Sequence, residues 1–71
     1  MSFSERLSEL QEDRGLERHD VFSATGISKT AYHRYIIGER EPTMPVLVSL
    51  ADFFKISTDY LLGRSNNPQR Y

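Results

Sequence analysis

The three consecutive residues Gly26, Ile27 and Ser28 constrain the fold of this chain more than any other short stretch of its sequence. Glycine is the residue that most readily ends a helix in a left-handed turn, and serine is a favoured N-cap at which the next helix begins. Because a single apolar residue separates them, they predict two helices joined by a tight turn. Ile27 is expected to be buried beneath that turn.

The segment after this turn has two chemically different faces. Ala31, Tyr32 and Tyr35 recur at helical spacing and are expected to face the core. The opposite side carries the polar residues Lys29, Thr30, His33 and Arg34. A shorter amphipathic stretch, residues 17–25, precedes the turn. A helix, a tight turn and a second helix with a polar outer face are typical of the helix-turn-helix units that read DNA.

The length of the chain limits what it can do. A domain of 71 residues buries only about 60% of the surface that its unfolded chain exposes, which leaves room for one core and a surface site but not for an enclosed catalytic cavity. The absence of cysteine excludes disulfides and cysteine-ligated zinc. No stretch is long enough to cross a bilayer and the first residues do not resemble a signal peptide, so we expect a cytosolic protein.

The charge balance argues against a strongly basic DNA-binding surface. Nine Lys and Arg residues oppose ten Asp and Glu residues, a formal net charge of −1, whereas contacts from Lys and Arg to phosphate supply most of the affinity for nucleic acid. The distribution is more favourable than the total. Four acids lie in the first segment, and Lys29, Arg34 and Arg40 cluster around the polar-faced segment.

Capping residues divide the chain into five short helices with no strand, which predicts an all-α, compact five-helix bundle. Ser2 and Glu5 form a capping-box pattern at the first helix, and Pro45 fits the first turn of the fourth. The pattern predicts one domain, residues 1–63, followed by a loose polar tail, residues 64–71. The expected helices span residues 2–14, 17–25, 28–37, 43–55 and 58–62.

At this point the sequence resembles a known family, the Xre/Cro-type phage-repressor helix-turn-helix domains. Four pieces carry the likeness, in the same order and spacing over roughly residues 3–63. They are Phe3-x-x-x-Leu7-x-x-Leu10 with Gly15-Leu16, then Gly26-Ile27-Ser28, then Tyr35-x-x-Gly38-x-Arg40-x-Pro42, and finally the Leu50–Gly63 stretch ending in Asp59-Tyr60-Leu61-Leu62-Gly63. The last piece is the most specific of the four.

The resemblance implies a repressor-type domain whose third helix enters the major groove of double-stranded DNA. Positions that touch base edges in the family match Lys29, Thr30 and Arg34 here, and His33 matches a position that reaches a base or the backbone. Backbone-contact positions match Ser28 and Arg40. Arg18 stands where many relatives have a glutamine that contacts phosphate and braces the first reading residue. The implied function is that of a phage or bacterial repressor that binds a two-fold operator as a homodimer, without a cofactor.

The sequence departs from the family pattern where its second and third helices cross. Phe22 stands where most relatives have alanine, and Tyr32 stands where an aliphatic residue usually packs against that alanine. We expect the two rings to need extra room, and Thr25, in place of leucine, to return some of that volume. Ile36 replaces a polar residue and gives an Ile36-Ile37 pair, which is either core or an exposed patch for a protein partner.

Other functions fit the residues less well. His19 and His33 lie on different helices without a third metal ligand nearby, and no third group orients Ser28 and His33 as a nucleophile and base, so we expect no metal and no enzymatic activity. The main alternative is a protein-interaction module, antirepressor or antitoxin-like, that keeps the fold and binds DNA weakly or not at all. Another is that the chain is the head of a longer repressor.

Two further expectations concern packing. Glu5, Glu9 and Glu12 follow a surface period near Arg6 and Arg14, which predicts exposed salt bridges. On the fourth and fifth helices some apolar residues are adjacent and cannot all point inward. One of these residues is therefore a candidate for a dimer contact: Phe53, Phe54, Leu61 or Leu62.

Overall fold

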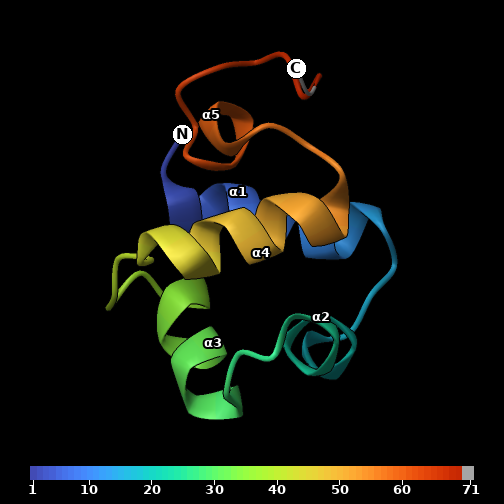
Figure 1. Ribbon diagram of the computed structural model, residues 1–71, viewed down its shortest axis with the longest axis vertical. Helices are drawn as coiled ribbons and strands as arrows, with labels where there is room; N and C mark the ends of the chain where they lie inside the picture. Colours follow the sequence, from blue (N-terminus) through green and yellow to red (C-terminus); the bar gives the residue numbers. More distant parts are fainter. Residues whose placement is uncertain (70–71) are drawn as a thin grey trace.

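The computed structural model describes residues 1–69, and that part of the chain folds into five helices without a strand (Figure 1). The predicted all-α, five-helix architecture is confirmed, and each helix lies where its capping residues place it. The helices are α1 (Phe3–Asp13), α2 (Arg18–Thr25), α3 (Lys29–Ile36), α4 (Met44–Phe54) and α5 (Thr58–Leu61).

Side-chain caps begin four of the helices. The hydroxyls of Ser2, Ser28, Thr43 and Ser57 each accept a hydrogen bond from the backbone N–H three residues later, which satisfies an amide that the helix itself leaves free. At α1 the Glu5 carboxylate also accepts from the Ser2 N–H at 3.2 Å, completing a capping box. The Ser2 hydroxyl also donates to Oε1 of Glu5 at 2.9 Å, and the two bonds that the carboxylate accepts from Ser2 lower the pKa of Glu5.

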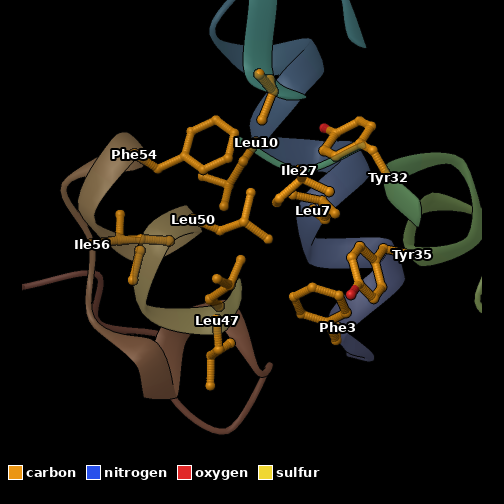
Figure 2. Close-up of a cluster of buried hydrophobic side chains, with 13 residues drawn as sticks. Phe3, Leu7, Leu10, Ile27, Tyr32, Tyr35, Leu47, Leu50, Phe54 and Ile56 are labelled. Atoms are coloured by element: carbon orange, nitrogen blue, oxygen red, sulfur yellow. The ribbon is translucent and has the colours of Figure 1, made fainter. Parts of the chain in front are cut away.

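One apolar core joins all five helices. Leu7 and Leu50 lie at its centre and are fully buried. Figure 2 shows Phe3 beside Tyr35 at one side of this core, where their rings meet edge to face with centroids 6.1 Å apart. Ile27, the single apolar residue of the turn, is buried in the same cluster as expected. The turn between α2 and α3 is therefore fixed to the core by its own side chain.

The helices are arranged with α2 and α3 at one end of the molecule. In Figure 1 they lie below α4, while α5, the N-terminus and the C-terminal segment gather at the opposite end. The tail returns to α5, because the Pro68 carbonyl accepts a hydrogen bond from the Ser57 N–H at 3.1 Å. The last two residues of the predicted tail, 70 and 71, lie outside the described residues.

The expectation of exposed ion pairs along α1 is wrong for Arg6. This arginine is only 5% exposed, its guanidinium carbon lies 3.8 Å from the centroid of the Tyr60 ring, and its pairing with Glu9 at 3.7 Å is made from that buried position. Arg14 donates to the Phe54 carbonyl at 2.8 Å. Both arginines therefore connect α1 to the C-terminal helices, which sequence spacing within α1 does not reveal.

The adjacent apolar pairs of α4 and α5 are each divided between core and surface. Phe54 and Leu61 are fully buried, so they are not available for a dimer contact. Phe53 and Leu62 are partly buried and pack against the edge of the core. A helix turns by about a third of a circle per residue, which is why neighbours in sequence separate in this way.

We predict that Gly63→Ala destabilises the fold more than Gly15→Ala. Both glycines have a positive φ, 76° and 62°, which costs an alanine roughly 1–2 kcal/mol. A Cβ on Gly63 would also collide with the backbone carbonyl of Met1, whereas nothing lies near a Cβ on Gly15. Urea unfolding should show Gly63→Ala to be less stable than Gly15→Ala by at least about 1 kcal/mol. Equal stabilities would contradict the close approach of Met1 to Gly63.

Candidate nucleic-acid interface

The inner face of α3 is tied to α1. Tyr32 has no exposed surface and Tyr35 is 2% exposed, which confirms the core-facing set predicted from helical spacing. The Tyr32 hydroxyl donates to Oε1 of Gln11, on α1, at 2.9 Å. Gln11 was not singled out by the sequence, because its partner lies 21 residues away. This hydrogen bond satisfies the polar end of a buried ring and fixes the position of α3.

The outer face of α3 is the part of the helix that solvent reaches. Its four side chains are all exposed: Lys29, Thr30, His33 and Arg34. Ser28 caps the helix through its bond from the Ala31 N–H at 3.1 Å, and Gly38, with φ 79°, ends the turn that follows. A short helix with one buried face and one polar face is thus held by its ends and by its two tyrosines.

The crossing of α2 and α3 accommodates both unusual aromatic rings. Tyr32 reaches toward α1, while Phe22 remains partly buried at the edge of the core. Their centroids are 6.2 Å apart and their planes are inclined by 54°, within the range of favourable aromatic pairs. His19 extends the contact on α2, edge to face with Phe22 at 5.6 Å. The Thr25 hydroxyl donates to the Val21 carbonyl at 2.8 Å.

Two helix N-termini meet at a surface hollow beside α3. The hollow has a volume of about 360 Å³, and its lining includes Ser28, Arg40 and Thr43. Ser28 and Thr43 are the N-caps of α3 and α4, so the partial positive charge of two helix N-termini lies close to the Arg40 side chain. The structure thereby brings together the two predicted backbone-contact residues, and it adds Thr43, which the sequence suggested only as a cap.

Arg18, at the start of α2, contacts α3 directly. Its Nη1 lies 2.7 Å from Nδ1 of His33, and both side chains are otherwise exposed. The family resemblance places Arg18 where a glutamine of many relatives contacts phosphate and braces the first residue that reads a base. In the structure Arg18 contacts His33, one helical turn further along α3 than Lys29. Fifteen residues separate the pair, and no periodicity within one helix could have indicated the contact.

Positive charge is concentrated around α3 even though the chain as a whole is not basic. Four of the nine Lys and Arg residues lie between positions 18 and 40, and all four are exposed: Arg18, Lys29, Arg34 and Arg40. Arg6 and Arg14 are engaged elsewhere by Tyr60 and Phe54. The same span contains two acids, Asp20 and Glu39, so exposed cations outnumber acids by two around the polar face of α3.

The Ile36-Ile37 pair is divided between core and surface. Ile36 is partly buried against the core, while Ile37 is 49% exposed at the C-terminal end of α3. Among residues 1–69, no group of three or more His, Cys, Asp or Glu side chains is placed to hold a metal ion. No helix in the same range has the length and apolar character needed to span a membrane.

Two short helices joined at a left-handed glycine, with a polar outer face on the second, define a helix-turn-helix domain. The chain belongs to the Helix-turn-helix family, whose model matches residues 7–61. A solved transcriptional regulator from Listeria innocua has the same fold, with a TM-score of 0.82 and 30% sequence identity over 93% of this chain and 62% of that one.

The curated relatives carry the names of transcriptional regulators and repressors. The chain is 39% identical over 64 residues to the cryptic phage CTXphi transcriptional repressor RstR of Vibrio cholerae, covering 90% of this chain and 57% of RstR. It is 35% identical over 65 residues to the HTH-type transcriptional regulator AnsR of Bacillus subtilis, covering 92% of this chain and 56% of AnsR. The chain thus spans little more than half the length of these relatives. The resemblance to Xre/Cro-type domains is confirmed.

We predict that Tyr32 makes the stability of the fold sensitive to alkaline pH. Burial raises the pKa of Tyr32 to about 12, although the charge of Arg18 acts in the opposite direction. In the unfolded chain a tyrosine titrates near pH 10. The neutral phenol is therefore favoured in the folded state. Its contribution to stability is complete below about pH 10 and is lost as the pH rises toward about 12.

The test compares the wild-type chain with Tyr32→Phe, which lacks this titration and keeps the other tyrosines. Between about pH 8 and about pH 11 the free energy of unfolding of the wild type should fall by about 1 kcal/mol more than that of the variant. Urea unfolding followed by circular dichroism measures the difference. Parallel pH profiles would show that ionisation of Tyr32 is not coupled to folding.

Proposed function

We propose that this protein is a sequence-specific, DNA-binding transcriptional regulator, a repressor of phage or bacterial origin, that reads a two-fold operator through α3. The observation that carries the proposal is the outer face of α3. Lys29, Thr30, His33 and Arg34 are all exposed there, on a helix whose inner face is fixed in the core. The names of the family's relatives support regulation of transcription. A regulator of this kind acts in the cytoplasm, where bacterial DNA lies.

The chemistry of the exposed face suits the major groove. An arginine such as Arg34 can donate to O6 and N7 of one guanine, and the methyl group of Thr30 can contact that of thymine. Beside this helix, the hollow at Ser28 and Arg40 offers hydroxyl, backbone amide and guanidinium donors to a phosphate. Residues 28–40 thus supply base contacts and backbone contacts on adjoining surfaces.

A homodimer is part of the proposal. Two copies would place their α3 helices in successive major grooves about 34 Å apart on one face of the duplex, and occupation of promoter DNA would then block polymerase. The exposed Ile37 is the side chain that we assign to a protein contact, with its partly buried neighbour Ile36 beneath it.

Selection of bound duplexes from a random pool, at moderate salt, tests the whole proposal. We expect a two-fold consensus whose half-sites are one helical turn apart, with an affinity that falls steeply as salt increases, because phosphate contacts release counterions. Failure to enrich any sequence, together with no binding of duplex at low salt, would overturn the proposal and favour the protein-interaction alternative.

Two arginines should differ in the kind of binding energy they supply. Arg34→Ala should cost on the order of 1–3 kcal/mol at one base position of the consensus, while Arg40→Ala should weaken binding to all sequences alike. Arg64→Ala is the matched control, since Arg64 is exposed and follows α5 at the end of the molecule opposite α3 (Figure 1). Fluorescence anisotropy with the consensus duplex and its single-base variants measures all three. An unchanged base preference in Arg34→Ala would show that Arg34 does not contact a base.

Ile37→Glu tests the protein contact separately. A charge placed in an apolar contact is strongly unfavourable, so the variant should be monomeric and bind a half-site as the wild type does, but lose the extra affinity for the full operator. Sedimentation velocity with and without operator DNA distinguishes these states. Unaltered dimerisation in Ile37→Glu would place the contact elsewhere on the domain.

A further inference from the structure

The contact between Arg18 and His33 determines which hydrogen bond His33 can offer to DNA. Arg18 Nη1 and His33 Nδ1 are 2.7 Å apart, a short and direct contact between α2 and α3. A guanidinium group can only donate hydrogen bonds, so Nδ1 of His33 must be the acceptor. The imidazole is then neutral, with its single proton on Nε2.

This tautomer gives His33 a defined chemical character. Nδ1 adjoins the stem of the side chain and is engaged by Arg18, whereas Nε2 lies at the far edge of a ring that is exposed to solvent. The free edge of the ring is therefore a donor and not an acceptor. A histidine that can adopt either tautomer could pair through Nε2 with a hydrogen-bond donor or with an acceptor. His33 held in this way can pair through Nε2 only with an acceptor.

The pair lies next to a residue of α3 that is anchored in the core. His33 follows Tyr32, which is fully buried and bonded to α1. Arg18 is the first residue of α2. Both members of the pair are thus located by the crossing of α2 and α3, where Phe22 contacts Tyr32, and not by flexible loops.

We propose that His33 is a specificity-determining residue that donates from Nε2–H to guanine, and that Arg18 is the positioning residue that fixes its tautomer. The inference rests on the proposed DNA-reading function and names a base for one of its positions. Guanine presents two adjacent acceptors, N7 and O6, in the major groove, whereas adenine presents one acceptor beside a donor, thymine one acceptor beside a methyl group, and cytosine only a donor. The nearby charge of Arg18 further favours the guanine edge.

The first test concerns the free protein and does not depend on DNA. Long-range ¹H–¹⁵N correlation spectra at neutral pH should show His33 with an unprotonated, hydrogen-bonded Nδ1 and a protonated Nε2. In Arg18→Met the Nδ1 resonance should move toward the position of a solvated ring, and Arg18→Lys should restore part of the shift. His19, the other histidine of the chain, is the internal control and should not change. A His33 proton on Nδ1, or spectra identical in wild type and Arg18→Met, would overturn the proposal.

The second test uses two substitutions of His33 that each preserve one end of the imidazole. Glutamine can place an amide donor near the position of Nε2, whereas asparagine can keep an acceptor for Arg18 near the position of Nδ1 but has no donor at the far edge. With the selected duplex and its single-base variants, His33→Asn should lose preference for one guanine by about tenfold. His33→Gln should keep binding at that base pair but share its preference between guanine and adenine, because the glutamine amide offers an acceptor beside its donor. Arg18→Met should weaken the preference at that same base pair and leave the preference due to Arg34 intact.

The outcomes separate this inference from the proposed function. If a two-fold consensus is selected but His33→Asn retains the full guanine preference, the inference fails and the proposed function stands. A preference of His33 for a different base likewise overturns the assignment to guanine. If no duplex is bound at all, both fail as statements about DNA, while the spectra still decide whether Arg18 fixes the His33 ring.

Discussion

The burial of Tyr32 is the interaction on which the geometry of the proposed interface depends. Its ring has no exposed surface, its hydroxyl donates to Gln11 on α1, and its face meets Phe22 on α2. One side chain of α3 therefore contacts both preceding helices. Because a helix of eight residues cannot remain ordered by itself in water, these contacts determine which side of α3 is presented to solvent.

The same arrangement explains how a chain with a net charge of −1 can present a basic surface. Arg6 of α1 and Arg14, the C-cap of that helix, join α1 to α5 and to the end of α4, through Tyr60 and the Phe54 carbonyl. The cations that remain exposed in residues 18–40 surround α3 and the hollow at its N-terminus. Electrostatic attraction to DNA depends on the local distribution of charge more than on its sum.

Much of the site could be predicted from the sequence because its signals are local. The cap at Ser28 and the spacing of Tyr32 and Tyr35 are sufficient to locate α3 and to assign Lys29 and Arg34 to its outer face. The partner of Arg18 could not be predicted in this way. The resemblance to the family indicates that the residue at position 18 makes a contact, but it does not say with which side chain. Arg18 contacts His33 because α2 and α3 cross at the Phe22–Tyr32 pair and the arginine side chain is long enough to reach the imidazole.

The sequence by itself determined the number of helices, their approximate ends, and the main apolar face of each helix, since caps and periodicity act within a few residues of the chain. Only the tertiary structure decided the burial of Arg6, the Gln11–Tyr32 bond and the contact between Arg18 and His33. Each of these depends on the approach of two helices that are distant in sequence. That approach is fixed by the packing of the whole core, in which every side chain constrains its neighbours, and it cannot be read from either segment alone.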